Sequence, residues 1–449
     1  MHVDERILRT VMPVAAEDYE KVRATGLVNA LIADGLVVAE RALGQNEARA
    51  IAVDASYVLE HPRLPFISHP YEWPFPALKA AALLHLDIHL RALKHDVTLS
   101  DASAYNIQFQ GVRPVFIDHL SFKPYQPGQY WLAHRQFCEQ FLNPLLLRSL
   151  LGVTHNAWYR GAVEGIATVD LARMLPMRKK LSWHVLTQVL LQASLQNRSA
   201  RMGDAAKVID SSRRRPLPKA SFQQMLRSLR NWISKLHPAD TGKTVWQDYD
   251  QQHSYGGDEV LAKRNFVTQF SAQVKPQMLW DIGCNTGEFS AAVLQAGTHA
   301  VIGLDVDQGA LEKAFARAQQ DELNLLPLYM DLSSPSPEQG WEQRERAGLA
   351  QRAQANAITA LALIHHLAIA RNIPLAYVVR WLVSLAPQGV IEFVPKTDPM
   401  VGRLLALRED IFTDYDEPTF IAALCAQARI VKRQVISTTG RELFWFSRE

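Results

Sequence analysis

The residues with the clearest chemical potential lie in the stretch LWDIGCNTGEFS, at positions 279–290. An apolar run with Asp281 near its end enters a turn that contains Gly283 and Gly287, and a helical pattern follows. Parallel α/β sheets bind ligands at such strand-to-helix loops. A pyrophosphate loop needs a further glycine where Asn285 stands, so that the main chain can approach the phosphates. The acid before the turn also disfavours a dianion, so the loop favours a cationic ligand without phosphate.

S-Adenosylmethionine (SAM) meets these requirements, because it has an ammonium and a sulfonium and no phosphate. Asp305 ends the next apolar run, 18 residues after Gly287, where a carboxylate accepts hydrogen bonds from two ribose hydroxyls. Asp331 ends a third run, where an acid suits the adenine amine and Leu332 suits the adenine face. The predicted cofactor-binding residues are Asp281, Gly283, Cys284, Asn285, Gly287, Asp305, Val306, Asp331 and Leu332.

Candidate catalytic residues follow the fourth and fifth strand-like runs. In-line methyl transfer requires alignment and exclusion of water, and a hydroxyl acceptor also requires a general base. His365, His366 and Glu392 are the candidate bases, although each histidine equally fits a polar residue that caps the strand exit. Trp246, Tyr249 and Tyr255 precede the first strand and are expected either to cover the site or to pack as a plain connection.

The elements that must position these residues alternate between strands and helices. Strands are predicted at 278–282, 300–305, 326–330, 357–363 and 389–394, with helical patterns between them. Such alternation predicts a parallel, doubly wound sheet. The last stretch, ARIVKRQVISTTGRELFWFSRE, predicts a hairpin that turns near Thr439-Gly440.

The region 258–449 resembles the class I SAM-dependent methyltransferases, whose loop the string DIGCNTGxxS matches. The resemblance implies an α/β, Rossmann-like sheet of seven strands, the last one antiparallel. An empty Rossmann-like domain and a nicotinamide enzyme are the weaker alternatives. We expect residues 1–237 to form an N-terminal domain and 238–257 to form a linker and active-site cover.

The N-terminal domain is predicted to be a mostly helical α+β domain. A buried helix is expected over 77–95, and two short strands, 107–110 and 114–117, flank a turn at Gly111. Helical periodicity dominates from Trp131 to about Leu236.

Three polar residues in this domain resemble part of a protein-kinase-like site around 60–150. Asp101 and Asn106 would match the catalytic loop and Asp118 the metal-binding aspartate of that family. The first hundred residues contain no G-x-G-x-x-G, and ARAIAVDASY offers no strand lysine to pair with phosphates. A degenerate kinase-like fold and an unrelated helical domain therefore both stay open.

The whole chain resembles a group of bacterial nodulation-associated, methyltransferase-like proteins. The strings that carry this resemblance span Ser100–Phe109, Phe116–Phe122 and Arg135–Leu147. The likeness implies that the two halves act together and names no methyl acceptor. We expect a SAM-dependent methyltransferase; the alternatives are a kinase-like phosphotransferase with a regulatory SAM-binding domain and a non-catalytic SAM-binding protein.

Composition indicates a soluble cytoplasmic protein. The chain is 48% hydrophobic and 21% charged, and its three cysteines have neither metal-binding nor disulfide spacing. The most apolar window, 357–370, is too short to span a bilayer. The net charge of +3 conceals a basic block at 171–236, with fourteen Lys/Arg and two Asp. That block could meet nucleic acid, a phosphorylated substrate or a membrane surface, or it could form a solvated basic face.

Overall fold

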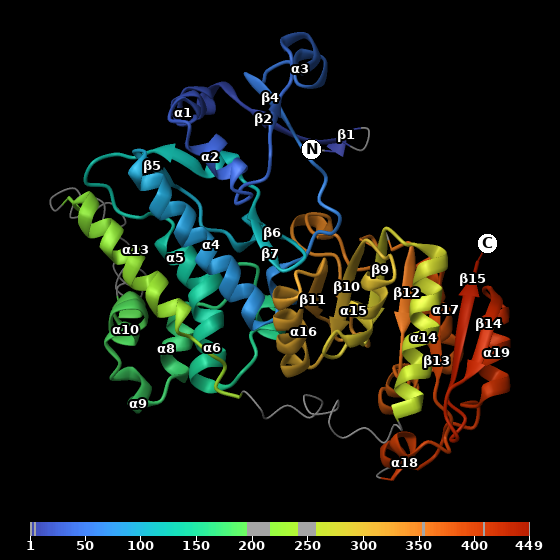
Figure 1. Cartoon of the computed structure of the whole chain (residues 1–449). Helices are drawn as coiled ribbons and strands as arrows, with labels where there is room; N and C mark the ends of the chain where they lie inside the picture. The colour runs from blue at the N-terminus through green and yellow to red at the C-terminus, as the bar shows by residue number, and fades with distance from the viewer. Residues whose placement is uncertain are drawn as a thin grey trace. The chain divides into compact units, whose positions relative to one another are not determined.

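The computed structural model describes residues 2–3, 6–194, 216–240, 257–352, 355–406 and 409–448. The chain divides into two units, Met1–Thr241 (unit 1) and Gly242–Glu449 (unit 2), which are coloured blue to green and yellow to red in Figure 1. No helix in the described ranges is long and apolar enough to cross a membrane.

Unit 1 begins with a four-stranded antiparallel sheet that the sequence patterns did not predict. Its strand order is β1-β2-β4-β3. The strands are β1 (His2–Val3), β2 (Arg6–Val11), β3 (Arg41–Ala42) and β4 (Tyr57–His61). Two of them are only two residues long, and β2 pairs with β4 across an intervening stretch that contains α1 (Pro13–Ala24). Short strands with distant partners leave little local periodicity for a sequence pattern to show.

The centre of unit 1 is the buried helix α4 (Phe75–Lys94), which confirms the helix predicted over 77–95. Its buried positions repeat at helical spacing and include His85 and His89, one turn apart. The amphipathic helix α13 (Lys219–Ser234) packs against α4 and buries an apolar stripe toward it. Arg230 of α13 also pairs with Asp87 of α4, so part of the basic block is used inside the unit.

The predicted hairpin of unit 1 is present as β6 (Ile107–Gln110) and β7 (Arg113–Phe116). Gly111 has a φ of 57° in its turn, where a side chain would be strained. The following region is largely helical, as expected. Its helices are α5 (His134–Phe137), α6 (Asn143–Leu151), α7 (Asn156–Gly161), α8 (Thr168–Met174), α9 (Met177–Lys180) and α10 (Trp183–Val185), with π-helical turns η4 (Cys138–Leu142) and η5 (Leu186–Leu190).

Unit 2 has a seven-stranded, mostly parallel sheet, as the resemblance implied, in the order β11-β10-β9-β12-β13-β15-β14. The strands are β9 (Met278–Ile282), β10 (Ala300–Asp305), β11 (Leu325–Tyr329), β12 (Ala357–Ala360), β13 (Gln388–Phe393), β14 (Arg429–Val435) and β15 (Glu442–Ser447). The last strand, β15, is antiparallel to both of its neighbours, as predicted. Strand β12 ends before the predicted 363, because the chain leaves the sheet at Ala362, where φ is 48°.

Helices cover the sheet of unit 2. Figure 1 shows α14 (Gly257–Val274), α15 (Glu288–Gln295) and α16 (Gln308–Gln320) in front of the strands. The strands are buried along almost their whole length from β9 to β12, which is expected where a parallel sheet has helices on both faces. The order reverses between β9 and β12, so the carboxyl ends of these strands form the crevice where such sheets bind ligands.

Candidate functional site

The loop after β9 is a turn that depends on left-handed backbone conformations. Gly283, Asn285 and Gly287 have φ values of 84°, 48° and 74°. Asparagine is among the few residues other than glycine that adopt this region readily. A side chain at Gly287 would also place its Cβ 3.1 Å from Leu325. Asn285 therefore sits where the turn needs a left-handed residue, and it leaves a side-chain amide in the loop.

Asp305, at the end of β10, is tied directly to this turn. Its Oδ2 accepts a hydrogen bond from the main-chain N–H of Asn285 at 2.8 Å, and its Oδ1 accepts one from Asp307 at 2.9 Å. Burial raises the pKa of this carboxyl to about 6. Each oxygen has a second lone pair, so the group can still accept hydrogen bonds from hydroxyls.

Asp281 is buried below the loop. Its two oxygens accept hydrogen bonds from the hydroxyls of Ser290 at 2.5 Å and Thr359 at 2.8 Å. Burial raises the pKa of this carboxyl, and the two hydroxyls partly offset that effect. Asp281 thus joins α15 and β12 to the first strand and also contributes to the wall of the pocket.

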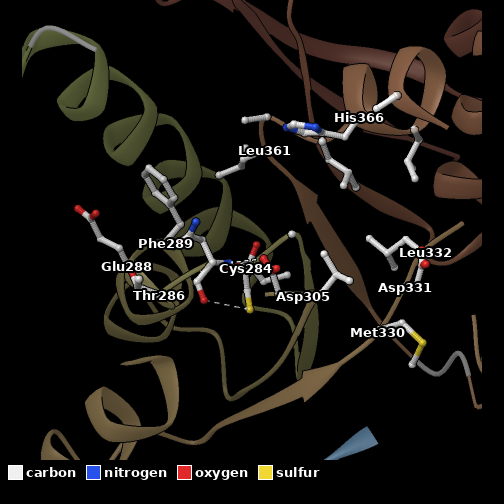
Figure 2. Close-up of a pocket in the computed structure, with 18 of the residues that line it drawn as sticks. Cys284, Thr286, Glu288, Phe289, Asp305, Met330, Asp331, Leu332, Leu361 and His366 are labelled. Carbon is white, nitrogen blue, oxygen red and sulfur yellow. Dashed lines mark hydrogen bonds between the residues drawn. The ribbon is translucent and has the colours of Figure 1, made fainter. Parts of the chain in front are cut away.

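A pocket of about 310 Å³ opens at these strand ends. Figure 2 shows Cys284 and Asp305 on one side of it, and Leu361 and His366 on the other. Its lining residues are Val260, Lys263, Asp281, Gly283, Cys284, Asn285, Thr286, Glu288, Phe289, Asp305, Val306, Met330, Asp331, Leu332, Leu361, Ala362, Leu363, His366, Leu367, Ala370 and Arg371. The structure thus brings together eight of the nine predicted cofactor residues, and Gly287 caps the helix beside them.

Asp331 and Leu332 lie together at the rim of the pocket, beyond β11 (Figure 2). Asp331 accepts hydrogen bonds from the main-chain N–H and the hydroxyl of Ser333, at 3.0 and 2.6 Å. Its second oxygen lies 3.2 Å from the guanidinium of Arg371. An acid and an apolar side chain are therefore adjacent on a wall that also contains Val306.

The two predicted histidines differ in their environments. His366 lines the pocket and begins the π-helical turn η7 (His366–Ala370). Burial lowers its pKa to about 4, and the charge of Arg441 adds to the effect, so its ring is neutral near pH 7. His365 is almost fully buried, and its ring centroid lies 4.2 Å from that of His366. Only His366 is therefore among the residues that line the cavity.

Glu392 lies behind the pocket wall in a buried group of charges. It is fully buried in β13, and its Oε2 lies 2.8 Å from Nζ of Lys263 on α14. The same oxygen accepts a hydrogen bond from the main-chain N–H of Ala362 at 2.8 Å. Its other oxygen lies 3.3 Å from Arg441, which also pairs with Asp398 at 2.6 Å. Glu392 thus holds two groups that line the pocket, Lys263 and Ala362.

The pocket contains a buried polar atom that suits a ligand. Oδ1 of Asn285 has no hydrogen-bond partner among the described residues. A buried acceptor without a donor costs free energy, so a donor on a bound molecule would satisfy it. Together with Asp305 and Asp331, it gives the cavity hydrogen-bond acceptors within a wall whose surface is mostly apolar. This donor-seeking set fits SAM, which offers an ammonium, two ribose hydroxyls and an adenine amine.

The kinase-like residues of unit 1 also meet, but their oxygens are engaged. Nδ2 of Asn106 donates to Asp101 at 3.0 Å and lies 3.5 Å from Asp118. Asp118 also pairs with the guanidinium of Arg9, from β2, and accepts a hydrogen bond from Ser121. The positive charge beside Asp118, which a metal ion supplies in the kinase-like family, is therefore provided here by Arg9.

Three predicted residues cannot be placed, and three residues at or behind the pocket were not predicted. The predicted cover residues Trp246, Tyr249 and Tyr255 lie outside the described residues. Sequence reasoning did not single out Lys263 or Phe289, which line the pocket, or Arg441, which pairs with Glu392. The helical pattern before the first strand could have placed Lys263 on a helix beside the sheet. Its pairing with Glu392 could not be predicted, because the two residues are far apart in the sequence.

Comparison with known proteins identifies a relative over the full chain. The chain is 47% identical over 452 residues to the nodulation protein NoeA of Rhizobium meliloti, covering 100% of this chain and 93% of that protein. It is 26% identical over 156 residues to the ribosomal protein L11 methyltransferase of Cellvibrio japonicus, covering 30% of this chain and 53% of that enzyme. The chain thus spans about half of that methyltransferase. No protein-family model matches the chain.

Solved structures also resemble part of the chain. One is magnesium protoporphyrin IX methyltransferase from Synechocystis with bound SAM, which is 17% identical, covers 45% of this chain and 89% of that one, and has a TM-score of 0.31. Another is the N-methyltransferase NodS from Bradyrhizobium japonicum, which is 13% identical, covers 42% of this chain and 97% of that one, and has a TM-score of 0.32.

Proposed function

The chain belongs to the family of the nodulation protein NoeA, and from this premise we propose that unit 2 is a SAM-dependent methyltransferase. The observation that carries the proposal is the link between the turn and the end of β10, in which Asn285 donates to Asp305 at the pocket wall. This link holds a carboxylate at the strand end where hydroxyl ligands are recognised in this type of sheet.

We assign the cofactor contacts to the acceptors that the pocket presents. Bound SAM supplies a methyl group made electrophilic by a sulfonium. Asp305 accepts hydrogen bonds from ribose hydroxyls, and Oδ1 of Asn285 accepts one from a donor at the amino-acid end. Asp331 accepts one from the adenine amine, while Leu332 and Val306 supply apolar contact. Asp281 supports the loop through Ser290 and Thr359.

His366 is our proposed general base. Its ring lines the cavity and is neutral near pH 7, because burial lowers its pKa to about 4, so a ring nitrogen can accept the proton that a hydroxyl acceptor loses as the methyl group is transferred. His365, buried behind it, orients the ring through their contact.

Glu392 is more consistent with a positioning role than with direct proton transfer. Glu392 is not among the residues that line the pocket, and its two oxygens pair with cations, Lys263 and Arg441. Through Lys263 it fixes α14, and through Ala362 it fixes the loop that precedes His366. Loss of this carboxylate would therefore change the shape of the pocket.

Unit 1 receives a separate proposal. The convergence of Asp101, Asn106 and Asp118 supports a degenerate kinase-like fold, while Arg9 beside Asp118 argues against a magnesium ion there. A regulatory or acceptor-delivering role for unit 1 thus suits the geometry better than phosphoryl transfer. We place the protein in the cytoplasm, where its three free cysteines would stay reduced.

The test is transfer of a labelled methyl group from SAM to a cell extract separated into nucleic acid, protein, glycan and small-molecule fractions. Wild type should label one fraction, and His366→Ala should lower the rate by about 100-fold or more while SAM still binds. His299→Ala, at an exposed position of the same unit, is the matched control and should match wild type.

Two outcomes would overturn the proposal. SAM binding without labelling of any fraction would favour a non-catalytic SAM-binding protein. Mg-ATP binding in the absence of SAM binding would favour the phosphotransferase alternative.

A further inference from the structure

A short segment of unit 1 presents large apolar side chains to solvent. Met177, Leu181 and Trp183 are 73%, 83% and 71% exposed. Met174 and Leu186, on either side, are each more than two-fifths exposed. We call Met174–Leu186 the 174–186 surface. Scattered apolar residues are normal on proteins, but five within thirteen consecutive positions mark an interaction site.

The segment is anchored in the fold, so the exposure is not that of a loose tail. Leu175 and Val185, near the two ends of the segment, are buried. His184 stacks on Trp232 of α13, with ring centroids 5.0 Å apart and planes at 25°, while the neighbouring Trp183 faces away. Met177 and Leu181 are four positions apart along the helical turn of α9, so they lie on the same side.

The same segment also carries three consecutive cations. Arg178, Lys179 and Lys180 form no ion pair with any residue in the described ranges. The sequence from 171 to 194 contains no Asp or Glu. Two cations later in the basic block are paired instead, Arg230 with Asp87 and Lys219 with Asp96. The 174–186 surface is therefore both apolar and positively charged.

We propose that the 174–186 surface docks on an anionic lipid bilayer. Leucine and methionine gain free energy in the acyl boundary, tryptophan prefers the interface, and lysine and arginine meet lipid phosphates. Nucleic acid would use the cations but would gain little from Met177 and Leu181. A second copy of the chain would place like charges against each other. The contact is peripheral, and it does not depend on the proposed methyl transfer.

The test is co-sedimentation of the full chain with vesicles of phosphatidylcholine that contain phosphatidylglycerol. Wild type should bind, and added salt should weaken the binding. The triple variant R178Q/K179Q/K180Q should bind on the order of 100-fold more weakly, because each cation contributes roughly five-fold. W183A should bind about ten-fold more weakly through lost apolar burial. W341A removes a tryptophan that is 82% exposed in unit 2 and should bind like wild type.

Circular dichroism will show that the variants are folded, which is expected because the changed side chains point to solvent. The proposal fails if wild type does not bind the anionic vesicles, or if it binds pure phosphatidylcholine vesicles equally well. It also fails if W183A and the triple variant bind like wild type. Tighter retention on duplex DNA than on vesicles, or a dimer that W183A dissociates, would identify a different partner and overturn it.

Discussion

Both units place a carboxylate at the end of a strand, as the last residue of β10 in unit 2 and two residues beyond β7 in unit 1, but the partners of the two carboxylates differ. In unit 2, Asp305 is held by the main-chain N–H groups of Asn285 and Asp307 and borders a pocket. In unit 1, Asp118 is paired with the guanidinium of Arg9. A carboxylate held by neutral donors keeps its charge available for a ligand, whereas one paired with arginine is already neutralised. An aspartate at a strand end can therefore either bind a ligand or form an internal ion pair, and its hydrogen-bonding and ionic partners determine which.

The largest effect of a single substitution is expected at the buried charges behind the pocket. Glu392→Ala removes the fully buried carboxylate that pairs with both Lys263 and Arg441. Removing one partner of such a group costs about 3–5 kcal/mol of unfolding free energy. Urea unfolding of the full chain, followed by tryptophan fluorescence, should show unit 2 unfolding at lower urea.

The matched control is Asp410→Ala, which breaks the exposed pair with Lys396. That change should leave the unfolding midpoint close to wild type, because exposed pairs contribute little. An unchanged midpoint for Glu392→Ala would contradict the assigned role of the buried group.

The second prediction is that the stabilities of the two units depend differently on pH. Burial lowers the pKa of His85 to about 4 and that of His155 to about 3, against an ordinary value of 6.5. The unfolded state therefore binds more protons below pH 6.5, and unit 1 loses stability as the pH falls from 6.5 toward 4. The loss is about 1.4 kcal/mol per pH unit for each histidine.

Unit 2 has an opposing contribution from Asp305, whose pKa of about 6 lies above that of an unfolded aspartate. Its folded state binds more protons between about pH 4 and 6, so acidification favours folding at this one group. His366 acts in the other direction with a shift of similar size, and burial also lowers the pKa of His365, so Asp305 offsets only part of the acid sensitivity of unit 2. In unit 1, burial lowers the pKa values of His61, His85, His89, His134 and His155. Hydrogen exchange read peptide by peptide should show unit 1 opening at higher pH than unit 2. The reverse order would contradict these assignments.

The smallest effect is expected at Arg9. Arg9→Ala removes the cation beside Asp118, and both side chains are partly exposed, at 37% and 13%. The cost to unit 1 should be about 1 kcal/mol, and SAM affinity should not change. Arg113→Ala, at an exposed position in β7, serves as the control in the same thermal-unfolding measurement. An effect of Arg9→Ala on SAM affinity would show that the two clusters are coupled.

Much of unit 2 could be predicted from the sequence because its determinants are local. The runs at 278–282 and 300–305 coincide with β9 and β10, since strands covered on both faces are continuous apolar runs. The turn could be predicted from Gly283 and Gly287, whereas the left-handed conformation of Asn285 became known only from the structure. The acids at strand ends followed from the topology of a parallel sheet.

What could not be predicted depends on distant partners. The first sheet of unit 1 pairs β2 with β4 at short strands of weak pattern. The role of Glu392 depends on Lys263 and Arg441, which reach it from α14 and from the residue before β15. The ion pair between Arg9 and Asp118 likewise joins residues that are more than a hundred positions apart in the sequence. These contacts depend on which residues meet in three dimensions, and the local sequence around each residue does not specify that.

The most direct test is a calorimetric titration of the full chain with SAM, comparing wild type, Asp305→Ala and Asp101→Ala. Asp305 contributes charge-assisted hydrogen bonds to hydroxyls, so its loss should weaken SAM binding on the order of 100-fold. Asp101→Ala, in unit 1, should leave the affinity unchanged. If wild type does not bind SAM, or if Asp305→Ala binds it as tightly as wild type, unit 2 is not the SAM site described above.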